Sequence, residues 1–511
     1  MLLRRQQCFC RASCAFFALV AGAFYADAAP STGKPAPERF SFETVVSEAK
    51  ALAASPYFQD MERVPRFYLE LSNEVEKQIQ FRPEKSIWLG TDSPWRLRLL
   101  HPGPLYNRIV RLFTVEGGVV QEVRYDRGRF TFGAEASHAA EHPGGHAGFF
   151  LSGAGGDFAM FAGGTQFRCL PTGVRAAWGM RARGVAVNAA VPGRTEDFPY
   201  FKKYWIERGS AGMSGAVVFA LMDSPFVSGA CRFEIIPGQR TVVGVQTVLF
   251  VREKVDSLGL APLSAMFWYG ENSLDKPQDF RPEVHNADGL LVRDADGRVR
   301  WRPLARRMTP HRSACSTGAL SGFGLRQRDT AFDNYQDLDN PYHRCPGVWV
   351  EPLGNWPEGK LYLTEQPTSQ ENWENVACYW QPAVVPAPGG SLHLRYRITW
   401  AMEGNFSDTL ARVTSTHAGR KADMPRVLKY LVDFSSIPGE TPDAKVPPQV
   451  NVFLSGPARL EGQRLVFNTE TQGWRLSLEI EPEYPAAIYN AKAVLLRDGR
   501  EVSENWDYVS E

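Results

Sequence analysis

Short strand-like runs separated by turn residues constrain the fold of this chain more than any other feature. Residues 109–125 contain two apolar-rich runs around Glu116-Gly117-Gly118, and a second hairpin pattern surrounds residues 294–297 (DADG). Residues 392–400 (LHLRYRITW) alternate apolar and polar side chains, as in a strand with one buried face. No comparable series of long amphipathic helices interrupts these runs, which argues against a βαβ architecture. The pattern predicts an all-β fold.

The runs also divide the chain. Residues 42–54 carry apolar residues at helical spacing after a capping Ser41, and predict one short helix. Residues 402–424 are rich in Gly, Ser, Thr, Asp and Lys without a period, and predict a linker between domains. The five or six short strands expected after it, in residues 425–511, predict a small immunoglobulin-like β-sandwich. Residues 40–401 then form the large domain.

The N-terminus has the anatomy of an export signal. Arg4, Arg5 and Arg11 precede the apolar run 15–25, and residues 26–28 (ADA) form a small-residue cleavage site. The run is too short to span the ~30 Å hydrocarbon core of a membrane. We expect a signal peptide at residues 1–28, cleavage after Ala28, a Pro-rich leader at 29–39 and no membrane insertion afterwards.

Charge and cysteine content narrow the class of ligand. The formal net charge is +1, so nothing points to nucleic acid, and the 12% of aromatic residues suit a neutral ligand. Five of the eight cysteines would remain after cleavage, without a CxxC pair, and are expected to be mostly buried thiols: Cys169, Cys231, Cys315, Cys345 and Cys378.

No motif predicts a metal or a cofactor. His138, His142 and His146 are each four residues apart, but residues 143–145 (PGG) break any helix there, so a surface loop is expected. GxSxG, P-loop and HExxH patterns are absent from the sequence.

Aromatic and polar stretches mark the candidate site. Residues 198–205 (FPYFKKYW) and 267–269 (FWY) are rich in rings that could pack on sugar C–H faces, although ordinary core and interface packing is the better explanation for any single ring. Residues 281–289 (RPEVHNADG) and 333–352 are dense in charged and aromatic side chains. We expect residues 198–205, 267–272, 281–288, 335–351 and 371–375 to converge on one groove.

These stretches carry a resemblance to a known family. Residues 281–290 (RPEVHNADGL), 322–327 (GFGLRQ), 349–352 (WVEP) and 371–380 (ENWENVACYW) resemble the periplasmic glucans biosynthesis proteins of the G/D type. The similarity covers about residues 40–400 in the same order. It implies a periplasmic protein with a large carbohydrate-enzyme β-sandwich joined to an immunoglobulin-like domain, acting in osmoregulated periplasmic glucan biosynthesis. Some members resemble inverting β-1,2-glucanases.

Three departures from the family pattern bear on mechanism. The family's H-D-S-D is here His285-Asn286-Ala287-Asp288, and its E-T-x-D-N is here Glu371-Asn372-Trp373-Glu374-Asn375. The resemblance places the general base at position 286 and the general acid at position 374. Asn286 cannot accept a proton from water at neutral pH. Cys345 stands where an Arg usually precedes the proline.

Two functions fit this sequence. The first is a diverged glycoside hydrolase or transglycosylase on a β-1,2-linked glucan, with Glu374 as acid and Asp288 or Asp337 assisting the base. The second is a non-catalytic protein that binds or chaperones nascent glucan, with the inner-membrane glucan synthase as a further expected partner. In both, the expected substrate-binding residues are Arg281, Glu283, His285, Asn286, Tyr335, Arg344, Trp349, Glu351, Trp268 and Glu371.

Overall fold

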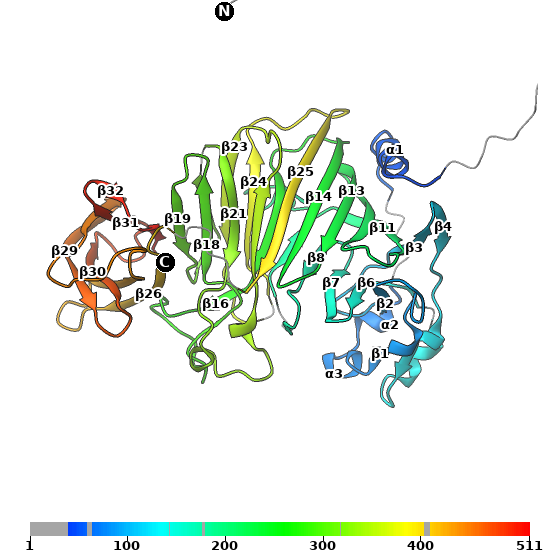
Figure 1. Cartoon of the computed structure of the whole chain (residues 1–511), viewed down its shortest axis with the longest axis horizontal. Helices are drawn as coiled ribbons and strands as arrows, with labels where there is room; N and C mark the ends of the chain where they lie inside the picture. Colours follow the sequence, from blue (N-terminus) through cyan, green and yellow to red (C-terminus); the bar gives the residue numbers. More distant parts are fainter. Residues whose placement is uncertain are drawn as a thin grey trace, which may run out of the picture. The chain divides into compact units, whose positions relative to one another are not determined.

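The computed structural model describes residues 39–58, 64–142, 144–175, 179–316, 318–371, 373–402 and 409–510. The predicted signal peptide, and all of the predicted leader except Arg39, lie outside these ranges. Residues 40–511 form one compact unit (Figure 1). No helix in the described ranges is long and apolar enough to cross a membrane.

Two large sheets confirm the predicted all-β class. The first has ten strands, with β10 (Val185–Val187) paired to β15 beside the main path. In spatial order that path is β2 (Arg96–Leu100), β6 (Gly148–Gly153), β7 (Gly156–Ala162), β8 (Gln166–Cys169), β9 (Arg181–Arg183), β15 (Leu258–Ala265), β24 (Val376–Pro382), β23 (Gly359–Glu365) and β20 (His311–Ser316).

The second sheet has fifteen strands, with β32 (Arg500–Glu501) paired to β31. In spatial order the others are β28 (Gln449–Ser455), β31 (Asn490–Arg497), β33 (Asn505–Val509), β19 (Val299–Pro303), β18 (Gly289–Asp294), β21 (Leu320–Arg326), β22 (Gly347–Pro352), β25 (Ser391–Ala401), β14 (Arg240–Val251), β13 (Val227–Ile236), β12 (Ala216–Asp223), β11 (Tyr200–Glu207), β3 (Arg111–Glu116) and β4 (Val119–Glu122). Figure 1 shows β25, β14 and β13 side by side at its centre.

The two sheets pack face to face. Phe161 of β7 lies 5.2 Å from Phe233 of β13, and Phe167 of β8 lies 6.0 Å from Trp400 of β25, measured between ring centroids. These rings belong to one buried cluster with residues from both sheets. Because side chains alternate along a strand, the neighbours of these core residues in the ten-stranded sheet point away from the core.

Smaller elements complete the fold. A four-stranded sheet contains β26 (Val413–Arg420), β27 (Leu428–Phe434), β30 (Gly473–Pro482) and β29 (Ala458–Asn468). Two-stranded sheets pair β1 (Ile79–Phe81) with β5 (Phe130–Phe132), and β16 (Phe267–Tyr269) with β17 (Val284–His285). The α-helices are α1 (Phe42–Ala53), α2 (Arg66–Leu69) and α3 (Asn73–Glu76), and the 3-10 helices are η1 (Pro83–Lys85), η2 (Arg127–Arg129), η3 (Ser137–Glu141), η4 (Phe332–Asn334) and η5 (Tyr342–Arg344).

Local predictions agree with these elements. The predicted helix is α1, where the N–H of Ser41 donates to Thr44 Oγ1 at 3.3 Å. The two predicted hairpins are β3–β4 and β18–β19. The five cysteines within the described residues are buried, as expected.

The C-terminal strands belong to two sheets. β28, β31, β32 and β33 belong to the fifteen-stranded sheet, where β33 runs parallel to β19, while the other four form the separate sheet. Strand β26 lies inside the segment expected to link the domains. The division at 402–424 and the immunoglobulin-like assignment stay predictions.

Candidate functional site

Residues 264–271 contact each of the three polar clusters that make up the candidate site, which contain Glu374, Arg281 and His285. Ser264, on β15, donates a hydrogen bond to Glu374 Oε2 at 2.8 Å. Phe267 stacks on His285 at 5.1 Å, and Tyr269 donates to the backbone oxygen of Arg281 at 3.2 Å. Asn375 accepts from the N–H of Phe267 and donates to its oxygen, both at 2.9 Å, which fixes the segment after Glu374. One short segment, from the end of β15 through β16 to Glu271, therefore contacts all of these clusters.

Glu374 is held between two arginines of β9. Arg181 Nη1 lies 2.9 Å from Oε1, and Arg183 Nη2 lies 2.8 Å from Oε2. The Glu374 side chain is 18% exposed. Burial alone would raise its pKa, but the two guanidinium groups and the Ser264 hydroxyl outweigh burial and lower it. These four residues, called the Glu374 clamp, keep the carboxylate ionised.

A groove of about 820 Å³ lies on the outer face of the ten-stranded sheet. Arg98, Phe150, Met160 and Arg168 lie directly opposite one another on β2, β6, β7 and β8, and all four line it. Arg98 lies over the Phe150 ring at 5.4 Å. On the next strands Arg181 is opposite Ser264, so the row leads from this sheet groove to the Glu374 clamp.

Arg281 joins three loops through charged hydrogen bonds. Its guanidinium donates to Asp279 Oδ2 at 2.9 Å, to Asp337 Oδ2 at 2.8 Å and to Glu371 Oε2 at 2.7 Å. Tyr342 donates to the same Glu371 oxygen at 2.9 Å. Arg281 is 9% exposed, and charge-assisted bonds of this kind are the strong ones. These five residues, called the Arg281 hub, hold the loop after β21 and the loop before β24.

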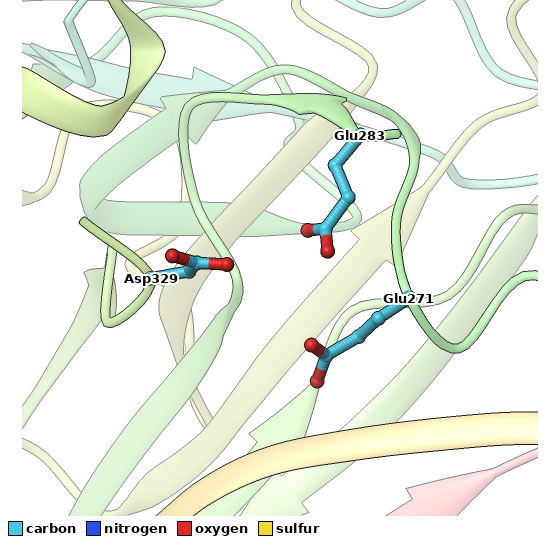
Figure 2. Close-up of side chains that lie close together, drawn as sticks. All are labelled: Glu271, Glu283 and Asp329. Carbon is cyan, nitrogen blue, oxygen red and sulfur yellow. The ribbon is translucent and has the colours of Figure 1, made fainter. Parts of the chain in front are cut away.

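A second cavity of about 380 Å³ contains a group of carboxylates. Figure 2 shows Glu271, Glu283 and Asp329 pointing toward one another, and one oxygen from each lies within 4.8 Å of the others. Such oxygens are ligands that hard cations prefer, so these three are the residues that could hold a metal. His285, Asp288, Trp301 and residues 414–417 of β26 also line this carboxylate pocket.

The pocket changes the acidity of its members. Burial, reinforced by Glu283, raises the pKa of Glu271 to about 8. Burial also raises the pKa of Asp288 to about 6, although nearby His285 lowers it. Burial would lower the pKa of His285, but its 2.7 Å bond to Glu283 and the charge of Asp288 outweigh burial and raise it to about 9. The pocket therefore retains protons near neutral pH.

The remaining predicted residues have structural contacts. Asn286 is 4% exposed, and its side-chain oxygen accepts from the N–H of Met266 at 2.9 Å. Tyr335 is fully buried and its hydroxyl accepts from Gln327 at 2.7 Å. Trp268 is partly buried beside Tyr269, and Arg344 is exposed at the end of η5.

Trp349 and Glu351 lie apart from the three clusters. Trp349 is 3% exposed and packs in the hydrophobic cluster that also contains Trp301. Glu351 makes a 3.5 Å ion pair with Arg397 on the neighbouring strand. The segments around 267–271, 281–288, 335–342 and 371–375 are joined by the contacts of the three clusters, but they do not converge on the one groove expected: residues of 267–271 and 281–288 line the carboxylate pocket, and residues of 335–342 line the sheet groove. Of the segment 198–205, Phe198 lies 4.7 Å under the guanidinium of Arg183, whereas Phe201 and Tyr204 are core residues.

Sequence reasoning missed several members of these clusters. Arg181 and Arg183 alternate in a three-residue strand and carry no motif. Glu271 and Asp329 follow recognisable segments, but nothing local indicates that they meet. The predicted histidine loop is exposed at His138 and His142, whereas His146 is 4% exposed, because it packs beside Tyr125.

Comparison with known proteins places the whole described fold in one family. Residues 40–510 match the family described as periplasmic glucan biosynthesis protein, MdoG. The chain is 34% identical over 488 residues to "Glucans biosynthesis protein G" of Shewanella frigidimarina (strain NCIMB 400), covering 92% of this chain and 84% of that protein.

Two further relatives agree. The proteins of the same name from Shewanella putrefaciens (strain CN-32) and Vibrio cholerae (strain M66-2) are 36% and 33% identical to this chain. The first match covers 87% of this chain and 85% of the relative, and the second covers 92% and 86%. The chain belongs to the periplasmic glucan biosynthesis protein family.

Proposed function

We propose that this protein acts in the periplasm, where it binds the backbone of a β-1,2-linked glucan along the sheet groove during glucan biosynthesis. The observation that carries the proposal is the row of Arg98, Phe150, Met160 and Arg168 across four adjacent strands. Strands lie ~4.8 Å apart, so such a row offers an extended surface rather than a single contact. It combines an apolar ring and a thioether with hydrogen-bond donors, which suits a neutral polymer of hydroxyl-bearing rings.

The Glu374 clamp supports binding better than acid catalysis. A general acid at neutral pH needs a raised pKa, whereas the pKa of Glu374 is lowered by Arg181 and Arg183. An ionised carboxylate accepts hydrogen bonds from sugar hydroxyls. Glu374 thus serves better to orient a glucan than to protonate its leaving oxygen.

Asn286, at the position where the family resemblance implies the general base, also argues for binding rather than hydrolysis. Asn286 accepts a backbone N–H and cannot take a proton from water. General base catalysis supplies ~10²–10⁴-fold in rate, so inverting hydrolysis by positions 286 and 374 is expected to be weak or absent. Asn286→Asp should raise hydrolysis if the rest of a catalytic site is intact.

Glucan processing is the second candidate, and the carboxylate pocket favours it. Glu271 has a pKa near 8 and Asp288 near 6, so one holds its proton at neutral pH while the other is largely ionised. Carboxyl groups with separated pKa values are what glycoside chemistry requires. In this reading Glu271 is the proton donor, and Glu271→Gln abolishes cleavage or transfer.

The test is titration of the purified protein with linear β-1,2-glucan, followed by chain-length analysis after long incubation. We expect saturable binding, unchanged chain length, and about tenfold weaker binding by Phe150→Ala. The matched control is Phe453→Ala, an exposed ring on β28, which should bind as the wild type does. Failure to bind any glucan overturns the proposal. Robust hydrolysis unaffected by Glu374→Gln points to an acid elsewhere, with Glu271 the first to test.

A further inference from the structure

Three large hydrophobic side chains are exposed on the loops that meet at the Arg281 hub. Leu338 is 87% exposed, Phe280 is 78% exposed and Trp373 is 58% exposed. Single exposed hydrophobic residues are ordinary, but a gathering of them marks a binding surface. A shared binding surface requires that the fold place these three residues on neighbouring segments.

The hub contacts bring together the loop segments that carry these three residues. Phe280 lies between Asp279 and Arg281, and the Arg281 guanidinium lies 5.5 Å from its ring centroid. Leu338 follows Asp337, whose carboxylate accepts from Arg281 and from the N–H of Asp339. Trp373 lies between Glu371, which binds Arg281, and Glu374 of the clamp. Each exposed residue is thus next to, or two residues from, a residue that is tied to Arg281.

These hydrogen bonds hold the loops of the hub in a defined arrangement. The hub connects segments that are 56 and 90 residues apart from Arg281 in sequence, through bonds of 2.7–2.8 Å to a guanidinium that is 9% exposed. The backbone beside each of these anchors is therefore restrained, while the three hydrophobic side chains remain open to solvent. The ionic contacts of the Arg281 hub do not themselves require a large exposed hydrophobic residue close to each of them.

The position of Leu338 and Trp373 beside the sheet groove indicates which ligand the three residues would bind. Leu338 lines the groove, together with Asp339 and Pro341. Trp373 directly precedes Glu374, the carboxylate to which the row across the sheet leads. A ligand lying along the groove would therefore meet these residues where it leaves the sheet, and the C–H faces of sugar rings pack on such apolar groups.

We propose that Phe280, Leu338 and Trp373 form a hydrophobic rim that binds the continuing glucan chain beyond the groove. The inference rests on the proposed function, because it assigns the rim to the same polymer. It makes Arg281 a positioning residue that acts through the rim. The rim extends the binding surface, so it contributes to long glucans and not to short ones.

The experiment compares glucans of two lengths. Linear β-1,2-glucan and a β-1,2-linked disaccharide are titrated into the wild type and into the double variant Phe280→Ala/Trp373→Ala, which leaves the groove-lining Leu338 in place. The matched control is Met308→Ala/Val384→Ala, which removes two side chains that are 74% and 79% exposed. We expect the rim variant to bind the long glucan at least tenfold more weakly, to bind the disaccharide as the wild type does, and to keep its thermal unfolding temperature. The control should match the wild type throughout.

Arg281→Ala and Arg281→Lys test the positioning role. Arg281→Ala should lose the length dependence while Phe280, Leu338 and Trp373 are all still present, and Arg281→Lys should restore it in part. A wild type that binds no glucan overturns the proposed function. A wild type that binds the long glucan, with a rim variant that binds it equally well, overturns only the rim. If that rim variant instead loses a protein partner that the wild type captures from an envelope extract, the rim is a protein-binding surface.

Discussion

Glu374 and Glu271 are two glutamates in opposite surroundings, although one short segment, residues 264–271, contacts the first and ends in the second. The oxygens of Glu374 face two guanidinium groups, whereas those of Glu271 face Glu283 and Asp329. Burial pushes both pKa values upward, yet the pKa of Glu374 is lowered and that of Glu271 is raised to about 8. The difference comes entirely from the neighbours.

The comparison separates two kinds of chemistry. A carboxylate clamped by arginines remains charged and suits the orientation of hydroxyl groups. A carboxyl among other carboxyls keeps its proton and suits proton transfer or a proton-dependent contact. The resemblance implied an acid at position 374, but the pKa of Glu374 is lowered, whereas that of Glu271 is raised to about 8.

The largest expected effect comes from removing the arginines that define the clamp. Arg181→Ala/Arg183→Ala leaves Glu374 largely buried without compensation, and should lower the free energy of unfolding by about 3 kcal/mol at neutral pH. Urea denaturation measures the loss. Adding Glu374→Gln to this variant should recover much of it, since no uncompensated charge then remains.

The exposed pair Arg397–Glu351 is the control for that experiment. Its side chains are 47% and 38% exposed, so Arg397→Ala should change the free energy of unfolding by less than about 0.5 kcal/mol. A clamp variant as stable as this control would mean that Glu374 is not held as an ion, and the contrast with Glu271 would disappear.

A smaller effect, with a definite pH dependence, is expected at Glu271. The pKa of Glu271 is about 8 in the folded protein and near 4.5 when unfolded, so the folded state binds the proton more tightly. Stability contributed by this group is full below about pH 4.5 and is lost as the pH rises toward 8. Glu271→Gln should therefore raise the free energy of unfolding at pH 8 and leave it nearly unchanged at pH 4.5, as urea denaturation at the two pH values would measure.

His285 adds a loss in the same direction. Its pKa is raised from 6.5 to about 9, so its contribution is full below pH 6.5 and disappears as the pH passes through 9. The wild type should accordingly lose stability between pH 5 and 9, and Glu271→Gln should remove the lower part of that slope. An unchanged slope in the variant would place the retained proton on another group.

The local parts of this fold could be predicted from the sequence, and the long-range parts could not. The helix after Ser41 and the turns at 116–118 and 294–297 depend on neighbouring residues, so their patterns suffice. The parallel pairing of Arg300 with Asn505 joins segments 205 residues apart, and no local signal specifies it. The predicted linker contains strand β26 because pairing with β27 decides its conformation.

The same limit applies to the site. Polar composition indicated residues 281–288, and the family resemblance indicated residues 371–375. Neither could indicate that Glu374 meets Arg181 and Arg183, whose positions depend on β9 pairing with β15. Trp349 was expected at the ligand but packs in the core, since the sequence does not say which face of β22 the four-stranded sheet covers.

The smallest expected effect comes from changing Glu283, the neighbour of Glu271 and His285 in the carboxylate pocket. Glu283→Gln removes one charge but keeps an oxygen that can accept from His285 Nε2. Burial, Asp288 and Asp329 remain, so the pKa of Glu271 should fall by only about one, and that of His285 should fall because it loses an ionic partner. Side-chain NMR titration resolves both groups. Glu351→Gln, which changes an exposed glutamate outside the pocket, should move neither. If Glu283→Gln also leaves both pKa values in place, Glu271, Glu283 and Asp329 do not share a site in solution, and the raised pKa of Glu271 would reflect burial alone.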